Sequence, residues 1–252
     1  MKKKLKLEKL DGLLWDMDGI LVDESESYRR CIISAVNYFL PENAWIGKLD
    51  VDKAKEIVGL NNDWDTSYAL YLQSVESKFD IEYFVRNLPQ YRKDKKYNEI
   101  RMVFQAFYLG NALFRTTYYQ PPPVSVSKGA ITNEKLFINK KQLSLLKKKY
   151  GLMGIVTGRP KAEAKYVLEK NDIDRYFDIV IALEDTEKGK PDPDPIDKAI
   201  NLLKLANTIY IGDSPSDVAA SKSAGIPSLY IGKNKLGDKN FANINNLLKF
   251  LL

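Results

Sequence analysis

Two aspartates at the end of an apolar run are the first residues of this chain that could do chemistry. Asp16 follows the run Leu13–Trp15, and Asp18 comes two positions later, directly before Gly19. Such a run is typical of a strand buried on both faces, and a glycine allows the sharp turn that lets both carboxylates face one cavity. Ligands of open α/β sheets bind beyond the carboxyl ends of the strands, so the pair is a candidate site; a solvated turn is the alternative for this motif taken alone.

Other polar residues follow later apolar runs in the same way. Thr157 and Asp213 end two further predicted strands, and Lys190 lies in the loop after a third. Because parallel strands end at one edge of a sheet, these side chains are predicted to converge on Asp16. Asp217 follows Asp213 by four residues, which is one helical turn and the same side. Several carboxylate oxygens without histidine or thiolate ligands suit Mg²⁺.

The composition narrows the chemistry further. The chain has no histidine and a single cysteine, Cys31, which we expect to be a small buried thiol in a helix. Histidine-dependent catalytic triads, the usual zinc sites and an intramolecular disulfide are therefore excluded. Acid–base work must fall to carboxylates or lysine.

The size and charge of the chain are those of an ordinary globular protein. It has 252 residues, of which 44% are hydrophobic and 29% charged, with a formal net charge of +6. The lysines are spread over helix-like segments, so we expect no nucleic-acid partner, although a basic protein attracts small anions such as a phosphorylated substrate. No signal peptide and no membrane span are predicted, which makes a cytoplasmic location the expectation.

Strands and helices alternate regularly in the second half of the chain. This pattern predicts a parallel sheet with right-handed crossovers, in an α/β fold. The predicted strands are 13–16, 152–157, 177–183, 208–213 and 226–232, and the predicted helices are 133–150, 161–170, 196–205, 214–225 and 241–252.

A helical insertion separates the first strand from the rest. Helical spacing predicts helices at 24–40, 51–58, 63–77 and 97–116, with aromatic residues packed as their core. The prolines Pro121–Pro123 then mark a linker. We therefore predict an α/β core of residues 1–24 and 126–252 and an all-helical domain of residues 25–125.

Four motifs in order, WDMDGILVD, IVTGRP, GKPDP and IGDSPSD, give the chain a specific resemblance. It resembles the haloacid dehalogenase superfamily of phosphohydrolases, and the helical insertion is similar to the cap of the phosphoglycolate phosphatase-like branch, subfamily IA. The resemblance implies a Rossmann-like sheet of strand order 5-4-1-2-3 with helices on both faces and a helical cap. The strands that carry Asp16 and Asp213 would then be neighbours.

The resemblance also implies a reaction and a role for each motif residue. Asp16 would be the nucleophile that forms an aspartyl-phosphate, and Asp18 the general acid and then the general base. A small phosphorylated metabolite would be bound through Thr157, Gly158, Arg159 and Lys190, of which Thr157 and Lys190 would also be catalytic. Mg²⁺ would be held by Asp16, Asp18, Asp213 and Asp217.

Related reactions on the same core are the alternatives to a phosphatase. Dehalogenation is disfavoured, because dehalogenases of this superfamily lack an acid at the position of Asp18. A phosphomutase keeps the same core residues and stays open, as does a phosphonatase with a lysine in the cap. A non-catalytic phosphometabolite-binding protein would be expected to have lost a catalytic residue, and none is missing.

Overall fold

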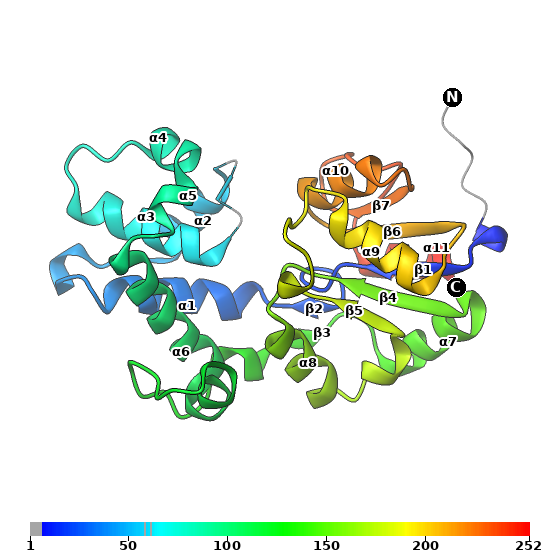
Figure 1. Ribbon diagram of the computed structural model, residues 1–252, viewed down its shortest axis with the longest axis horizontal. Helices are drawn as coiled ribbons and strands as arrows, with labels where there is room; N and C mark the ends of the chain where they lie inside the picture. The colour runs from blue at the N-terminus through cyan, green and yellow to red at the C-terminus, as the bar shows by residue number, and fades with distance from the viewer. Residues whose placement is uncertain (1–6, 58, 61) are drawn as a thin grey trace. The chain divides into compact units, whose positions relative to one another are not determined.

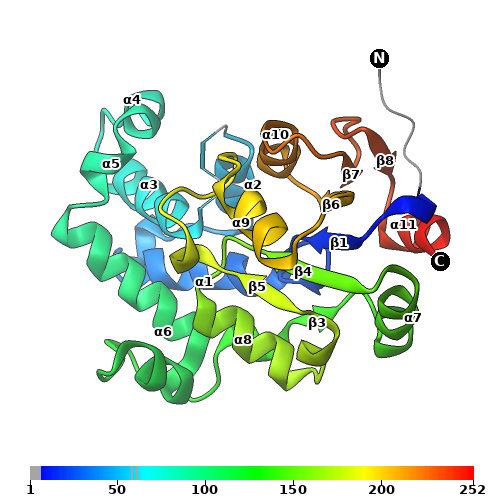
Figure 2. The same cartoon turned by 45° about the vertical axis from the view of Figure 1, so that its right-hand side comes forward.

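A computed structural model describes residues 7–57, 59–60 and 62–252 of the chain (Figures 1 and 2). The chain forms two compact units, one built from residues up to 23 together with residues 135–252, and one from residues 24–134. We call the first the α/β unit and the second the helical unit. Residues 1–6, which belong to the predicted core, and Val58, at the end of a predicted helix, lie outside the described residues.

The α/β unit is built on a parallel sheet. Its strands follow the order β5-β4-β1-β6-β7-β8, and every neighbouring pair is parallel. The first five strands of this sheet, taken in chain order, therefore lie in the predicted order, and β8 extends the sheet at the edge beside β7. The bounds are β1 (Gly12–Trp15), β4 (Leu152–Val156), β5 (Ile179–Ile181), β6 (Thr208–Gly212), β7 (Ser228–Ile231) and β8 (Lys239–Phe241).

Helices cover both faces of this sheet, as predicted. Helices α9 and α10 lie on one face, and α7 and α8 lie on the other (Figures 1 and 2). The side chains of the central strands are buried between these layers, among them Leu14, Val156 and Tyr210. The helices are α7 (Lys140–Tyr150), α8 (Lys161–Lys170), α9 (Asp194–Leu203), α10 (Pro215–Ser223) and α11 (Ile244–Leu251).

Two of the predicted helices begin later than the sequence indicated. The side chain of Asn139 accepts a hydrogen bond from Gln142 N at 2.9 Å, and Gln142 Oε1 accepts one from Asn139 N at 2.9 Å. This capping box starts α7 at Lys140. The preceding strand β3 (Lys135–Leu136) pairs in antiparallel fashion with β2 (Val22–Asp23), and neither strand was predicted. Two-residue strands carry too few residues to show an alternating pattern.

The C-terminal segment 241–252 was predicted to be helical throughout, and its first part is not. Phe241 belongs to β8 and pairs with Ile231 of β7. The side chain of Asn243 accepts a hydrogen bond from Asn246 N at 3.0 Å, which caps α11 and starts it at Ile244. The side-chain cap at Asn243 therefore sets the start of α11, which the apolar pattern placed three residues too early.

The helical unit contains the four predicted helices and two short ones that were not predicted. The aromatic side chains at helical spacing are its core, as predicted, and Phe84, Tyr97 and Phe114 are at most 5% exposed. The short helices escaped prediction because neither reaches two turns. The bounds are α1 (Ser25–Asn37), α2 (Lys48–Lys55), α3 (Asp63–Val75), α4 (Ile81–Arg86), α5 (Leu88–Tyr91) and α6 (Lys95–Tyr118).

Helix α6 is interrupted at one glycine. Gly110 has a φ of 73°, a conformation that side chains rarely adopt, and a Cβ there would lie 2.4 Å from the backbone nitrogen of Gly129. The close approach of the two backbones requires glycine at this position.

An ion pair between a buried carboxylate and a half-exposed arginine in the helical unit yields a stability prediction. Asp65 is 1% exposed and accepts hydrogen bonds from Arg92 Nη2 at 2.6 Å and from Tyr97 Oη at 2.8 Å. Arg92→Met should lower the free energy of unfolding by about 2 kcal/mol, because it leaves a buried carboxylate with Tyr97 as a donor but without its cation. Urea denaturation measures this loss. Lys95→Met, which removes an exposed ion pair to Glu99, is the control and should change stability by less than about 0.5 kcal/mol. Equal effects of both substitutions would contradict the role of Arg92.

Candidate active site

Asp16 lies where the sequence analysis expected it, at the carboxyl end of the central strand β1. Its backbone N–H donates to Ile211 O of β6 at 2.8 Å, which continues the ladder of the sheet past Trp15. The side chain is 9% exposed, and its Oδ1 accepts the N–H of Met17 at 2.8 Å. The carboxylate is therefore held by backbone on a rigid part of the sheet.

Lys190, from the loop before α9, inserts its ammonium group beside this carboxylate. Nζ lies 2.9 Å from Asp16 Oδ1 and 2.6 Å from Asp217 Oδ1, and it donates to Tyr210 Oη at 2.9 Å. The Lys190 side chain is 10% exposed. A buried ammonium is retained only when it is paired and hydrogen-bonded, and these oxygens meet that requirement.

Asp217 is fixed from the other side by the first turn of α10. Its Oδ2 accepts the hydroxyl of Ser214 at 2.7 Å and the N–H of Ser214 at 3.0 Å, while Ser214 Oγ accepts Asp217 N at 3.2 Å. This reciprocal arrangement is a capping box. Both oxygens of Asp217 are thus engaged, one with Lys190 and one with the helix terminus.

The electrostatics of the cluster follow from burial and from the competing charges. Burial raises the pKa of Asp16 well above its ordinary value, and the neighbouring Asp217 adds to the rise. Burial alone would lower the pKa of Lys190, but Asp16 and Asp217 raise it well above its usual range. Burial alone would likewise raise the pKa of Asp217, but Lys190 and the bonds from Ser214 hold it below its ordinary value. The stable charge pair is therefore Lys190 with Asp217.

Asp213 differs from these residues because its carboxylate is not paired. Within the described residues, the Asp213 side chain forms no ion pair and no hydrogen bond to another residue, and burial together with Asp217 raises its pKa to about 7. Gly19, with a φ of 67°, leaves room for it, since a Cβ there would lie 1.9 Å from Asp213 Oδ2. A half-buried carboxylate without a cationic partner is a candidate ligand for a cation.

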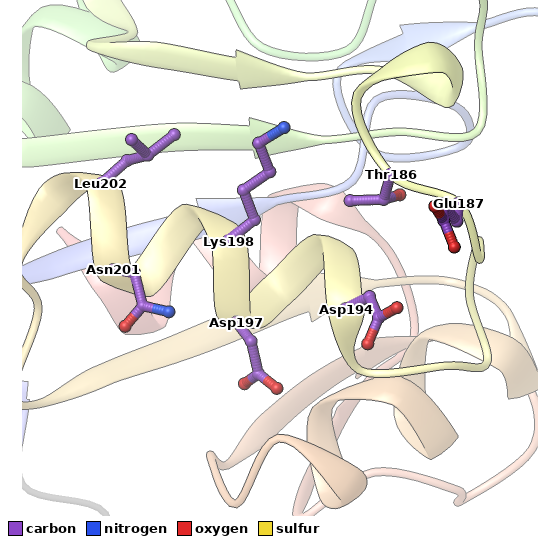
Figure 3. A pocket seen from close by; sticks show the side chains of 7 residues that line it. All are labelled: Thr186, Glu187, Asp194, Asp197, Lys198, Asn201 and Leu202. Carbon is purple, nitrogen blue, oxygen red and sulfur yellow. The ribbon is translucent and has the colours of Figure 1, made fainter.

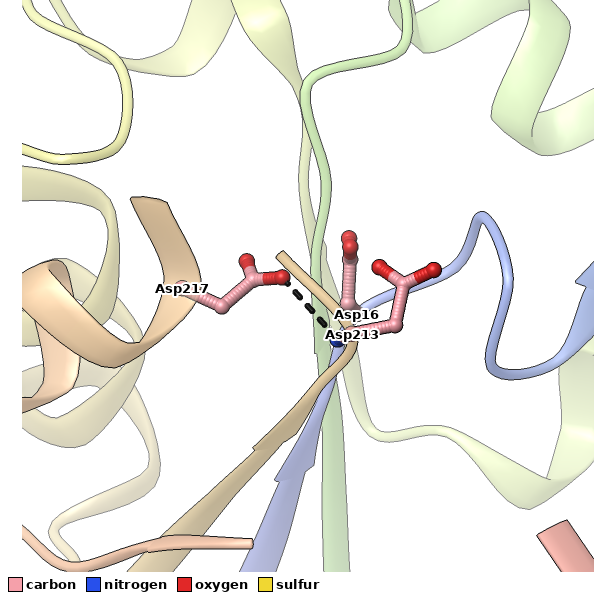
Figure 4. A group of neighbouring side chains, drawn as sticks. All are labelled: Asp16, Asp213 and Asp217. Carbon is pink, nitrogen blue, oxygen red and sulfur yellow. Dashed lines mark hydrogen bonds between the residues drawn. The ribbon is translucent and has the colours of Figure 1, made fainter. Parts of the chain in front are cut away.

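Three carboxylates could share such a cation. Ligand oxygens of Asp16, Asp213 and Asp217 lie within 4.8 Å of one another at the carboxyl ends of β1 and β6 (Figure 4). Figure 4 also shows the hydrogen bond of 3.2 Å from Asp213 N to Asp217. An all-oxygen set fits Mg²⁺, and the unpaired Asp213 is the member with free lone pairs. Asp217, whose oxygens are engaged, fits an indirect role.

The remaining predicted residues form a second group. Arg159 is 5% exposed and donates from Nε to Asp18 Oδ1 at 2.6 Å, with its Nη2 on the same oxygen. The N–H of Arg159 donates to Thr157 Oγ1 at 3.1 Å, and Gly158 between them is exposed. The side chain of Asp18 is 35% exposed and faces Arg159, so its carboxylate is not a member of the three-carboxylate group.

The structure thus joins Asp16, Lys190, Asp213 and Asp217 directly and pairs Asp18 with Arg159. Sequence reasoning missed Tyr210 and Ser214. A tyrosine within the otherwise aliphatic strand β6 was a usable signal, because the hydroxyl of a buried tyrosine has to find a partner. A serine three residues before an aspartate at a helix start was the signal of the cap.

A separate hollow runs along α9, away from these residues (Figure 3). It has a volume of about 460 Å³, and acidic side chains of α9 and of the preceding loop line it together with Lys198. None of the candidate site residues lines it. Its lining residues are Thr186, Glu187, Asp194, Asp197, Lys198, Asn201 and Leu202.

None of the helices in the described part of the chain combines the length and the apolar character that a membrane span requires.

Comparison with known proteins bears on this arrangement. Residues 138–231 match the family model described as haloacid dehalogenase-like hydrolase. The phosphoglycolate phosphatase of Salmonella choleraesuis is 26% identical over 234 residues, which are 89% of this chain and 82% of that protein. A pyrophosphatase PpaX of Halalkalibacterium halodurans is 37% identical over 82 residues, which are 32% of this chain and 38% of that protein. The chain spans about two fifths of the length of the first curated relatives it matches.

Solved structures share the fold. The phosphatase Tt82 from Thermococcus thioreducens superimposes with a TM-score of 0.68 and 21% sequence identity, over 94% of this chain and 97% of that chain. The match to the family model includes three of the four motifs, IVTGRP, GKPDP and IGDSPSD. The chain is thus similar to the haloacid dehalogenase-like hydrolases, whose family model matches its residues 138–231.

Proposed function

We propose that this protein is a Mg²⁺-dependent phosphatase that hydrolyses a small phosphorylated metabolite through an aspartyl-phosphate intermediate. The observation that carries the proposal is the buried Asp16 carboxylate, held at the strand end beside the Lys190 ammonium and the unpaired Asp213. Related proteins named as phosphoglycolate phosphatase and pyrophosphatase support a small phosphorylated substrate.

Asp16 is the nucleophile in this proposal. Its Oδ1 already accepts bonds from Met17 and Lys190, and within the described residues Oδ2 accepts none, so Oδ2 is the oxygen with lone pairs to offer. A carboxylate oxygen attacks phosphorus, the bond from phosphorus to the ester oxygen breaks, and the phosphoryl group passes to Asp16. Water then attacks the same phosphorus, and inorganic phosphate and the free carboxylate are released.

Asp18 moves the protons of both steps. In its protonated form it gives a proton to the departing alkoxide, and as a carboxylate it takes one from the attacking water. Arg159, with two N–H donors on one oxygen of Asp18, orients this carboxyl group. The N–H of Arg159 in turn fixes the hydroxyl oxygen of Thr157, whose proton has no acceptor among the described residues and would be donated to a phosphate oxygen.

Charge on the phosphoryl group is balanced by two cations. Lys190 lies 2.9 Å from Asp16 and neutralises charge that spreads over the phosphoryl oxygens in the transition state. Mg²⁺, held by Asp16, Asp213 and the Asp18 carbonyl with Asp217 behind them, would supply further positive charge to the bound phosphate.

A panel of phosphorylated metabolites tests the proposed reaction. Purified protein with Mg²⁺ should release inorganic phosphate from at least one small phosphate monoester. Conversion of a sugar phosphate into its isomer without net release of phosphate would identify a phosphomutase instead. Binding without any turnover would identify a non-catalytic protein.

We further propose that the helical unit is a cap that selects the substrate. It is inserted between β2 and β3, directly after the strand end that carries Asp16 and Asp18. The residues assigned to phosphate and metal all belong to the α/β unit, so another surface must read the rest of the substrate. Insertion at this point of the chain makes the helical unit the candidate.

The register of β2 and β3 allows a direct test of the cap. Asp23 pairs with Lys135 in antiparallel fashion, so an Asn-Gly turn could join them in place of residues 24–134. We expect this variant to lose turnover of the preferred metabolite by about a hundredfold more than turnover of p-nitrophenyl phosphate, because the small ester needs only the phosphate site. Circular dichroism and a cooperative thermal transition are the controls for folding. Equal losses on both substrates in a folded variant would contradict the cap proposal.

A further inference from the structure

Tyr210 spans three strands of the sheet with one side chain. It belongs to β6, its ring is fully buried, and its hydroxyl donates to the carbonyl of Val156 at 2.9 Å. Val156 is the last residue of β4, and β1 lies between β4 and β6. The tyrosine therefore ties the strand that leads to Asp213 to the strand that leads to Thr157, beneath the end of the strand that leads to Asp16.

The same hydroxyl contacts the Lys190 ammonium, and the proton arrangement there is fixed by chemistry. An ammonium group has three protons and no lone pair, so Tyr210 Oη accepts from Lys190 Nζ across their 2.9 Å contact. The single hydroxyl proton is then free for Val156 O at 2.9 Å, with Asp217 Oδ1 farther away at 3.3 Å. The three protons of Lys190 face Asp16, Asp217 and Tyr210, and Val156 O lies farther away at 3.4 Å.

We propose that Tyr210 is a positioning residue that holds the Lys190 ammonium against Asp16 during turnover; this inference rests on the proposed phosphatase function. When Asp16 is phosphorylated, the negative charge of its carboxylate is replaced by charge on the phosphoryl oxygens, so the charge that attracts Lys190 changes position within each cycle. Tyr210 is neutral and is fixed by the sheet, and its bond to Lys190 is the same before and after phosphoryl transfer. Tyr210 therefore keeps Lys190 Nζ in place while Asp16 is phosphorylated.

Removal of the hydroxyl isolates this role from packing. Tyr210→Phe keeps the buried ring and deletes the acceptor. The Lys190 side chain, which has four rotatable bonds, then keeps Asp16 and Asp217 as its close acceptors. We expect kcat for p-nitrophenyl phosphate to fall about tenfold, which corresponds to about 1.4 kcal/mol of lost transition-state stabilisation. KM should stay within about twofold, because the substrate-binding residues themselves are unchanged.

Tyr150→Phe is a matched control. Tyr150 is 4% exposed and its hydroxyl donates to a backbone carbonyl, Leu251 O, at 2.8 Å, in the same unit. Both variants lose one buried hydroxyl bond to a carbonyl, and Tyr210→Phe loses in addition the bond from Lys190, so its thermal stability should fall at least as much. Only Tyr210→Phe should lose kcat. A role of Tyr210 in packing alone predicts that the two variants behave alike.

A measurement on Lys190 itself tests the proposal without reference to catalysis. In protein labelled with ¹⁵N-lysine, a buried ammonium held by three acceptors should give a resolved NH₃⁺ resonance that exchanges slowly with water, assigned by its loss in Lys190→Met. We expect this resonance in the wild type and in Tyr150→Phe, and proton exchange about tenfold faster in Tyr210→Phe. Faster exchange in a protein with no phosphatase activity would refute the proposed function and keep the positioning role. Equal exchange in all three proteins, or a fast-exchanging Lys190 in the wild type, would overturn the positioning role.

Discussion

Asp16→Asn should abolish turnover of phosphate esters, with a loss of about a thousandfold or more, in a protein that still folds. The amide cannot attack phosphorus as a carboxylate does, and the other groups of the site act only on a phosphoryl group that is being transferred to this residue. Hydrolysis of p-nitrophenyl phosphate in the presence of Mg²⁺ measures the loss.

Folding of this variant can be predicted from the pKa of Asp16. Burial and Asp217 raise that pKa above its value in the unfolded chain, so the ionised carboxylate opposes folding at pH values above the folded pKa. Asparagine carries no charge, and the melting temperature of Asp16→Asn at pH 8 should equal or exceed that of the wild type. Asp174→Asn, an exposed site in the same unit, is the control with unchanged activity. Turnover by Asp16→Asn within tenfold of the wild type would refute the assignment of Asp16 as the nucleophile.

Removal of divalent cations should have an effect of similar size. We expect activity to fall at least about a hundredfold in excess chelator and to return with Mg²⁺, because the buried Asp16 and the half-buried Asp213 are otherwise left as uncompensated carboxylates beside the phosphate. Asp213→Asn should raise the Mg²⁺ concentration needed for half-maximal activity. Added Ca²⁺ should restore less activity than added Mg²⁺, since Ca²⁺ prefers more ligands and longer distances. Full activity in excess chelator would exclude a required cation.

The pH dependence of this requirement follows from Asp213. Its pKa is raised to about 7, and a carboxyl group has to lose its proton before it can bind a cation. The Mg²⁺ concentration for half-maximal activity should therefore fall as the pH rises from 6 to 8, and the change should be largest near pH 7. Titrations with Mg²⁺ at fixed pH values measure this. In Asp213→Asn the dependence near pH 7 should be weaker, and an equal dependence in both proteins would assign it to another group.

Much of the fold could be predicted because its signals are local. The apolar run Leu13–Trp15 and the later runs at regular spacing gave the parallel sheet, and the helical spacing gave the layers around it. The errors fall where a few residues decide the outcome. Asn139 and Asn243 set helix starts through single side-chain bonds, and β2 and β3 are too short to show a period. The pairing that forms these strands is between segments far apart in the chain.

The candidate site shows the same division. Asp16, Lys190, Asp213 and Asp217 could be placed together from the sequence, because each follows a strand and all parallel strands end at one edge. Which of these charged side chains pair with one another could not be predicted from the sequence. Whether Lys190 pairs with Asp217 or Asp213, and whether Asp18 faces the metal cluster or Arg159, depends on side-chain positions set by tertiary packing.

The most direct test of the account is to find where the phosphoryl group resides during turnover. Wild-type protein mixed with p-nitrophenyl phosphate and Mg²⁺ is quenched within one turnover, treated with borohydride to reduce any aspartyl-phosphate to homoserine, and digested for mass spectrometry. The account predicts homoserine at Asp16 and at no other aspartate, and none in Asp16→Asn. Homoserine at a different position, or rapid turnover with no reduced aspartate at any quench time, would contradict it.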